Sequence, residues 1–286
     1  MTDKRREAEA LLRGGYDLHA HSFPSHVKRC VDDFELLEQA DKSGMAGVVI
    51  KNHYESTAAR AALVNKRGGY AAHAYGGVVL NWPAGGLNPY AVESALKLGG
   101  SFVWLPTRDA ANCLQFGDMP GDFFSRPGIE ILDESGRLIP AFYEVLEVVK
   151  KYDAVLATGH VGIQEAIAVC REARRAGVLT VLTHPEWKRT VIPLQVQIEL
   201  AGIGVIIEKN WANIDDGDCT AGQMAAHIRA VGAEHIFIAT DRGQNWKEAP
   251  VEGMLRFIEV LLENGFTREE IHTMVCDVPG RLVKEK

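Results

Sequence analysis

Residues 16–21 read YDLHAH, a short apolar run that ends in a pair of histidines. Seven further runs of β-branched and aliphatic residues follow along the chain, and each ends at polar or turn-forming residues. Such nearly continuous apolar runs are typical of parallel strands that are buried on both faces. The seven runs are GVVIKNH (47–53), YGGVVLNW (75–82), SFVWLP (101–106), AVLATGH (154–160), LTVLTH (179–184), GVIIEKN (204–210) and IFIATD (236–241).

Segments with helical periodicity separate these runs, and glycines 44, 177 and 265 stand where three of the helices should end. Strand followed by helix, eight times over, predicts an α/β fold with a right-handed parallel barrel. We therefore expect one domain over residues 1–286, a single (β/α)8 barrel of the TIM type. The clearest expected helices cover 33–42, 139–151, 163–176 and 250–264.

The interval between the fourth and fifth runs, from 106 to 160, is the longest in the chain. It contains an aromatic, glycine-rich stretch at 112–127 (NCLQFGDMPGDFFSRP) and an expected hairpin at 129–139. An insertion that follows a barrel strand lies on the catalytic face of the barrel. We expect a lid there, with Gly117–Arg126 as its mobile part.

Composition limits the classes of partner. The 286 residues are 47% hydrophobic and 24% charged, which is ordinary for a globular domain with a large core. A formal net charge of −7 disfavours nucleic acid and anionic membranes as partners, and no apolar run reaches the roughly 18–20 residues of a membrane helix. The five cysteines are widely spaced, which favours reduced thiols in the cytoplasm. We expect a cytoplasmic protein that acts on a small molecule, with homo-oligomerisation left open.

Five of the ten histidines fall at the ends of expected strands, together with one aspartate. The ends of barrel strands converge on one mouth, so these residues should meet there. Two histidines two residues apart on a strand point to the same face. A lone histidine at a strand end is more often structural, but imidazoles gathered with a carboxylate suit zinc, and also manganese, iron or nickel. The set predicts one or two divalent metal ions and comprises His19, His21, His53, His160, His184 and Asp241.

The motifs DLHAH (17–21), TGH (158–160), THP (183–185) and ATD (239–241) resemble those of the amidohydrolase superfamily, and VPGRL (278–282) resembles the segment that follows its last strand. The resemblance spans the barrel and implies a metal-dependent hydrolase. It implies that His19, His21 and Asp241 bind one ion and that His160 and His184 bind a second. For a single ion, it implies His160 as a ligand, His184 as the group that polarises the substrate, and Asp241 as the acceptor of the proton from water.

The fourth expected strand departs from this pattern. Binuclear members of the superfamily carry a bridging carboxylated lysine or a glutamate there, whereas this chain has LPTRD (105–109). Lys51 ends the second run instead. A carboxylated Lys51 could bridge two ions, and the alternative is that Lys51 binds substrate or forms a buried ion pair.

Metal ions that activate water predict hydrolysis of an amide, lactone, ester or cyclic imide. Two alternatives remain open. DLHAHS (17–22) with KNH (51–53) also resembles the PHP phosphoesterases, in which His53 would be a metal ligand, but the expected glutamate of the third strand is missing from VVLNW (78–82). A mononuclear decarboxylase or lyase on the same barrel is the other alternative.

Cations near the expected strand ends favour a substrate with a carboxylate or phosphate, although solvated loop charges would look the same. We expect His53, Arg108 and Arg242 to bind substrate, with Glu208 and Asn210 adding polar contacts. The cations are Lys51, Arg108, Lys188, Lys209 and Arg242. Aromatic residues expected to wall the ligand or to pack under the lid are Trp82, Phe116, Phe123, Phe124 and Trp187.

Overall fold

The strands of the computed structural model, which describes residues 3–283, lie in two all-parallel sheets. One sheet has the order β1-β2-β3 and the other the order β4-β5-β6-β7-β8-β9. The strands are β1 (Tyr16–Ala20), β2 (Gly47–Ile50), β3 (His73–Tyr75), β4 (Gly77–Val79), β5 (Phe102–Trp104), β6 (Val155–Ala157), β7 (Leu179–Leu182), β8 (Ile206–Asn210) and β9 (Ile236–Ala239).

The two sheets join into one ring. β3 and β4 are separated by Gly76 alone, and this segment pairs with β2 through its first half and with β5 through its second. At the other junction, the amide of Asp241 donates to the carbonyl of His19 at 2.8 Å. The amide of His21 donates to the carbonyl of Arg242, also at 2.8 Å. Over the described residues the strands thus close into a parallel barrel with eight strand positions, which confirms the expected fold.

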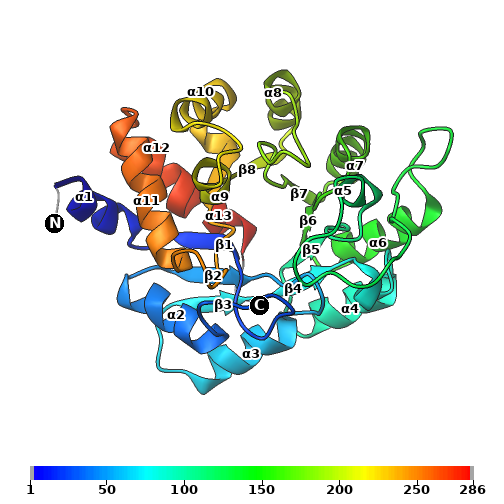
Figure 1. Ribbon diagram of the computed structural model, residues 1–286, viewed down its shortest axis with the longest axis horizontal. Coiled ribbons are helices and arrows are strands. Elements are labelled where there is room, and N and C mark those ends of the chain that lie inside the picture. The colour runs from blue at the N-terminus through cyan, green and yellow to red at the C-terminus, as the bar shows by residue number, and fades with distance from the viewer. Residues whose placement is uncertain (1–2, 284–286) are drawn as a thin grey trace.

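Helices surround the barrel (Figure 1). The four helices expected from periodicity are confirmed to within one residue at each end, and α2 begins at a capping box made by Asp32 and Glu35. The helices are α1 (Asp3–Leu12), α2 (Asp33–Lys42), α3 (Ala58–Arg67), α4 (Pro89–Lys97), α5 (Ala111–Leu114), α6 (Pro140–Lys151), α7 (Ile163–Arg175), α8 (Leu194–Gly202), α9 (Trp211–Asp215), α10 (Ala221–Val231), α11 (Pro250–Glu263), α12 (Arg268–His272) and α13 (Val278–Leu282), with short turns η1 (Trp82–Ala84), η2 (Ala233–His235) and η3 (Thr273–Asp277).

The core has two layers. The larger layer lies between the strands and the helices, as amphipathic helices on a two-sided sheet require. The smaller layer fills the barrel interior with side chains such as Leu18, Val49 and Trp104, and it includes Val278 and Leu282 of α13. The last described helix, α13, therefore closes one end of the barrel and leaves the other end for the site.

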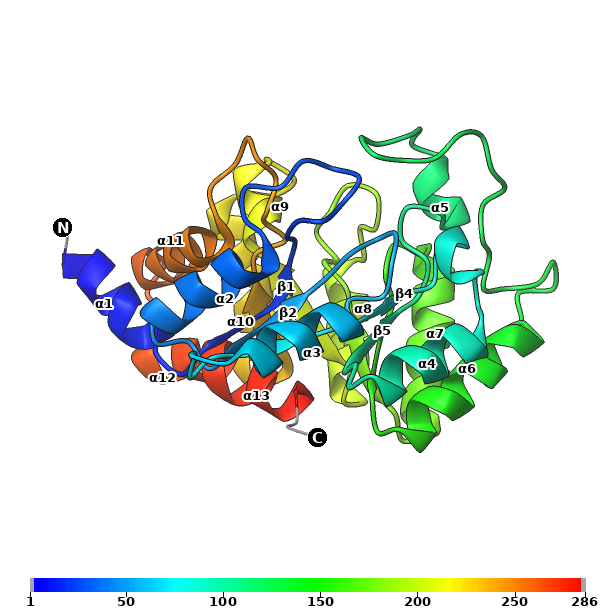
Figure 2. The ribbon, with the colours of Figure 1, turned by 90° about the horizontal axis from the view of Figure 1, so that it is seen from below.

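The long connections gather at the open end of the barrel, away from α13 (Figure 2). The expected hairpin in the insertion is confirmed by the bond from the amide of Asp133 to the carbonyl of Arg137, 2.8 Å. Ahead of the hairpin, the stretch 117–126 is tied down, because Arg126 pairs with Asp109 and Asp122 pairs with Arg108. Its mobility stays a prediction.

The structure bears on the expectations about membrane helices and about the cysteines. Among residues 3–283, no helix combines the length and the hydrophobicity that a membrane span requires. All five cysteines have free thiols. The cytoplasmic location and the single domain over 1–286 stay predictions.

The turn after β6 depends on a glycine. Gly159 has φ +62°, and a Cβ there would lie 2.3 Å from the carbonyl oxygen of Leu105. Gly217 has φ +80° with no atom within 4 Å of its would-be Cβ. We expect Gly217→Ala to lower the free energy of unfolding by about 1 kcal/mol, from backbone strain alone. Gly159→Ala should lower the free energy of unfolding by at least about 2 kcal/mol more than Gly217→Ala, because the turn after β6 would have to move away from the backbone at Leu105. Chemical denaturation measures both, and equal losses would contradict the packing argument.

Candidate metal centre

An irregularity in β1 turns its histidines inward. Leu18 belongs to the barrel interior and Ala20 to the outer layer, so the regular alternation breaks between them, where the register with β2 also shifts. His19 and His21 lie beyond that break and both are buried. The common direction expected of this pair is therefore confirmed, although a local break in the strand produces it.

Hydrogen bonds fix both imidazoles. Nδ1 of His19 lies 2.6 Å from Oε1 of Glu208, and Nδ1 of His21 lies 2.8 Å from the carbonyl of Lys51. Both partners accept only, so each Nδ1 donates, and with a metal ion bound each Nε2 would supply its lone pair to that ion. The two Nε2 atoms lie 3.2 and 3.0 Å from the same oxygen, Oδ1 of Asp241. Second partners of this kind orient the histidine ligands of metal sites.

The chemistry of these donors fits a divalent metal ion. The ligand atoms of His19, His21 and Asp241 all lie within 4.8 Å of one another. Two neutral imidazoles and a carboxylate form a ligand set that zinc accepts, as do manganese and iron. The structure therefore brings together the first three of the expected ligands.

Burial and neighbouring charges act in opposite directions on the pKa values of His19 and Asp241. Burial and Lys51 lower the pKa of His19, but Glu208 and Asp241 outweigh them and raise it to about 9. Burial opposes ionisation of Asp241, yet His19 and His21 hold its pKa well below the ordinary value. Without metal, the cluster thus keeps a proton on or beside His19, and an arriving cation must displace it.

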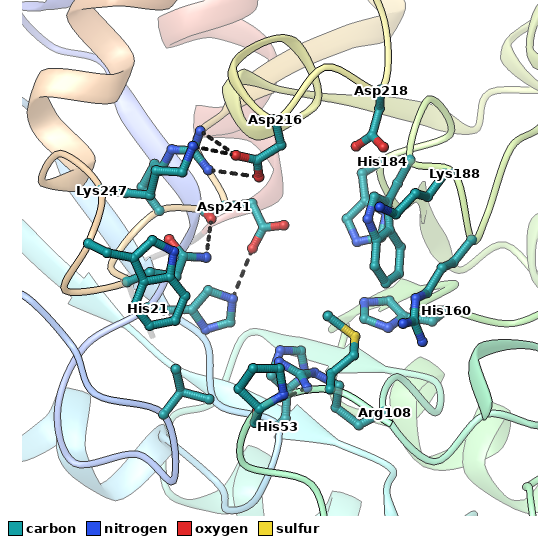
Figure 3. A pocket seen from close by; sticks show the side chains of 18 of the residues that line it. His21, His53, Arg108, His160, His184, Lys188, Asp216, Asp218, Asp241 and Lys247 are labelled. Carbon is teal, nitrogen blue, oxygen red and sulfur yellow. Dashed lines mark hydrogen bonds and ion pairs between the residues drawn. The ribbon is translucent and has the colours of Figure 1, made fainter. Parts of the chain in front are cut away.

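His53, His160 and His184 continue the ring of imidazoles. Ring centroids are 5.1 Å apart for His21–His53, 5.7 Å for His53–His160 and 5.0 Å for His160–His184. In Figure 3, His160 and His184 face Asp241 from the opposite side of the cavity. Burial lowers all three pKa values, that of His184 to about 4, so these rings are neutral. They stand near the three-ligand group, and their binding of a second ion stays a prediction.

Threonine hydroxyls contact Nδ1 of both His53 and His184. Oγ1 of Thr107 accepts from the side-chain amide of Asn81 at 2.7 Å and lies 2.8 Å from Nδ1 of His53. Its own proton is free to be donated to Nδ1 of His53, and in that arrangement Nε2 of His53 carries a proton. The hydroxyl of Thr190 instead donates to the carbonyl of His184, so it accepts from Nδ1 of His184 at 3.2 Å. Nε2 of His184 then presents a lone pair.

Lys51 reaches the cluster from β2. Its Nζ lies 2.9 Å from Nε2 of His19 and 5.6 Å from the ring centre of Trp104. Trp104 is the inward residue of β5, the fourth strand position of the barrel. Burial lowers the pKa of Lys51 to about 8, which favours the neutral amine that carboxylation requires. Both interpretations of Lys51 remain predictions.

The expected cations differ in where they point. Arg108 and Lys188 line the cavity. The expectation that Lys209 faces the mouth is wrong: strand alternation puts Glu208 inside the barrel and sends Lys209 outward to Glu186 and Gln197.

Arg242 lines the cavity but is fully buried. Each of its guanidinium nitrogens is bonded to a carboxylate, from Asp215, Asp216 or Glu248. Its charge is thereby neutralised within the protein. Substrate binding by Arg242 stays a prediction, and these ion pairs do not support it.

The aromatic residues expected near the ligand lie at two different pockets. Trp187 walls the cavity, with its ring centre 4.7 Å from that of His160. Trp82, Phe123 and Phe124 line a different, outer pocket with Arg126. Of the two alternatives, a common wall around one ligand is therefore wrong for Trp82, Phe123 and Phe124.

Two residues of the site had no role in the sequence predictions. Asp17 accepts from the hydroxyl of Thr240 at 2.5 Å and from the amide of His19 at 3.1 Å, and so ties β1 to the end of β9. Arg29 lines the cavity from the loop after β1. Asp17 stands inside the quoted DLHAH motif, whereas nothing in the sequence around Arg29 distinguishes it from other loop cations.

Comparisons with known proteins agree with this fold. A family model described as "Family of unknown function (DUF6282)" matches residues 14–208. No curated protein matches the sequence. Among solved structures, an amidohydrolase from Pseudomonas aeruginosa superposes with a TM-score of 0.64 at 14% identity, covering 97% of each chain.

Two further structures show the range of enzymes on this fold. A 2,6-dihydroxybenzoate decarboxylase from Rhizobium has a TM-score of 0.57 at 13% identity, covering 94% of this chain and 98% of its own. The TatD homologue YjjV of Escherichia coli K12 has a TM-score of 0.57 at 14% identity, covering 95% and 98%. The fold is thus that of the amidohydrolase superfamily, as the motifs implied, and such distant likeness says nothing of the reaction.

The geometry predicts a bound transition metal. We expect the purified protein to contain one or two equivalents of zinc, manganese, iron or nickel by elemental analysis. The double variant His19→Ala, His21→Ala should lose it, because it removes two of the three converging ligands. His272→Ala changes an exposed histidine and should keep the metal. Equal metal content in all three proteins would refute the assignment, and two equivalents in the wild type would favour a bridging Lys51.

Proposed function

The chain belongs to DUF6282, a family of unknown function, and we propose from the site that it is a metal-dependent hydrolase of a small molecule with an amide, lactone, ester or cyclic imide bond. One observation carries the proposal: Nε2 of His19, Nε2 of His21 and Oδ1 of Asp241 converge at a cavity of about 460 Å³. A divalent ion held by them would polarise a carbonyl oxygen and acidify a water molecule.

The position of Asp241 supports a role in moving the proton. Oδ1 is directed to the two histidines, and the carboxylate is the most exposed member of the cluster, with 27% of the side chain exposed. Its lowered pKa keeps it ionised and able to accept a proton from water. The same carboxylate can then return the proton to the leaving group.

The tautomers that these hydroxyl contacts favour support different roles for His53 and His184. An imidazole that polarises a carbonyl oxygen must donate a hydrogen bond, and Nε2 of His53 is protonated for that task. Nε2 of His184 presents a lone pair, which suits a ligand of a second ion or a base. We therefore propose that His53 takes the polarising role that the mononuclear pattern gave to His184.

This assignment bears on the alternatives. In the phosphoesterase alternative His53 is a metal ligand through Nε2, which requires the other tautomer, in which Nδ1 donates to Thr107. Decarboxylation remains the second candidate, because the group formed by His19, His21 and Asp241 would suit a mononuclear site equally well.

The first test removes the base. Asp241→Asn should lower turnover of any ester, lactone or amide that the wild type hydrolyses by at least about two orders of magnitude, since both a ligand oxygen's charge and the proton acceptor are lost. Asp218→Asn is the matched control, because Asp218 lines the same cavity without contacting the histidines. Near-normal turnover in Asp241→Asn would rule out its role.

The second test separates donor from ligand at position 53. His53→Gln can place an N–H close to the position of Nε2, whereas His53→Ala cannot. We expect both variants to keep the metal, with turnover about tenfold or more lower in His53→Ala than in His53→Gln. Elemental analysis and steady-state kinetics measure the two effects. Loss of metal from either variant would instead support ligation by His53.

A further inference from the structure

Three buried polar atoms beside the cavity lack a hydrogen-bond partner. They are Nε of Arg29, Nε of Arg108 and the hydroxyl of Tyr54. Buried polar groups are normally satisfied, and a group left open in a finished fold points to something that binds there. Both arginines line the cavity that contains His21, His53 and Asp241.

The fold holds Arg29 in place without neutralising it. The amide of the next residue, Cys30, donates to the carbonyl of Gly243 at 2.9 Å, and Arg29 itself bridges to Gln244. The loop after β1 is therefore fastened to the loop after β9. Within residues 3–283, no carboxylate forms an ion pair with the Arg29 guanidinium. Burial lowers its pKa to about 10, and Arg108 adds to this, although Asp241 opposes the shift.

Arg108 is oriented by the insertion. Its Nη1 donates to Oδ1 of Asp122 at 3.0 Å and to the carbonyl of Pro120 at 3.2 Å. These bonds use one side of the guanidinium and leave the Nε side open. The charges of Arg108 and Arg126 are matched by Asp109 and Asp122, whereas the Arg29 guanidinium has no carboxylate partner of this kind among the described residues.

Resting on the proposed function for the identity of the ligand as substrate, we propose that Arg29 and Arg108 form a carboxylate-binding subsite beside the candidate metal centre. The substrate is then a small carboxylic acid whose carboxylate is anchored there while its scissile bond faces His53 and Asp241. Two guanidinium edges match the planar carboxylate, which accepts hydrogen bonds through both oxygens.

Tyr54 lies next to this subsite. A Cβ on Gly121 of the insertion would lie 2.8 Å from its hydroxyl, so the insertion passes directly over the ring. The positive charges of Arg108 and Arg29 act on this hydroxyl, while burial raises its pKa. Tyr54 therefore stays protonated and can supply a third donor to an oxygen held between the arginines.

Binding of head-group analogues tests the subsite without knowledge of the substrate. Benzoate, phenyl phosphate and benzamide share one ring and differ in the group offered to the arginines. We would titrate each by calorimetry into the purified protein, with metal content determined for every variant. The variants are Arg29→Gln, Arg108→Gln and the control Lys28→Gln, which changes an exposed cation one residue from Arg29.

We expect benzoate to bind the wild type and Lys28→Gln equally, and to bind Arg29→Gln and Arg108→Gln about tenfold or more weakly. Benzamide should bind all four proteins weakly. Arg108→Gln also loosens the insertion, so Arg29→Gln decides the outcome. Absence of benzoate binding to the wild type, equal affinity in Arg29→Gln, or tighter Arg29-dependent binding of phenyl phosphate would each overturn the carboxylate assignment.

The outcome is separable from that of the proposed function. Arg29-dependent benzoate binding in a protein that hydrolyses no ester, lactone or amide would keep the subsite and reject the hydrolase. Metal-dependent hydrolysis with benzoate affinity unchanged in Arg29→Gln would keep the hydrolase and reject the subsite.

Discussion

Two backbone hydrogen bonds, from Asp241 to His19 and from His21 to Arg242, join the last strand of the barrel to the first. Around them, the buried carboxylate of Asp17 binds the amide and hydroxyl of Thr240 and the amide of His19. Burial raises the pKa of Asp17 to about 6, against the lowering effect of these bonds. The closure places the histidines of β1 within ligand distance of the carboxylate after β9, so the metal centre exists only in the closed barrel.

The site also stores backbone strain. Asp241 has φ +51° and His184 has φ +25°, both in the left-handed region that residues with a Cβ seldom adopt. Such conformations cost on the order of 1–3 kcal/mol each and persist only where the surroundings enforce them. At Asp241 the enforcement comes from the closure bonds, and at His184 from the contacts of Thr190. The strain falls on two residues that line the cavity, the proposed base Asp241 and the possible metal ligand His184.

Strands and loops have different tasks in this protein. The strand ends supply the histidines, Asp241 and Lys51, whose positions follow from the barrel itself. The proposed carboxylate subsite comes from the loop after β1 and the residues after β5, fastened by Gly243 and Asp122. Loops of this kind vary without disturbing the barrel, which is why one fold carries hydrolases and decarboxylases alike. In this proposal, residues at the strand ends carry out the reaction, and residues in the loops select the substrate.

The sequence by itself determined the barrel and the grouping of His19, His21 and Asp241, because continuous apolar runs, helices of period 3.6 and histidines at run ends are local patterns. Only the tertiary structure decided that Lys209 points away from the mouth, that Arg242 is neutralised, and that threonine hydroxyls contact His53 and His184. Those outcomes depend on hydrogen bonds and ion pairs between residues distant in sequence, which no local pattern records. Arg29 is a further example. Its proposed role depends on having no carboxylate partner among residues 3–283, which only the folded chain reveals.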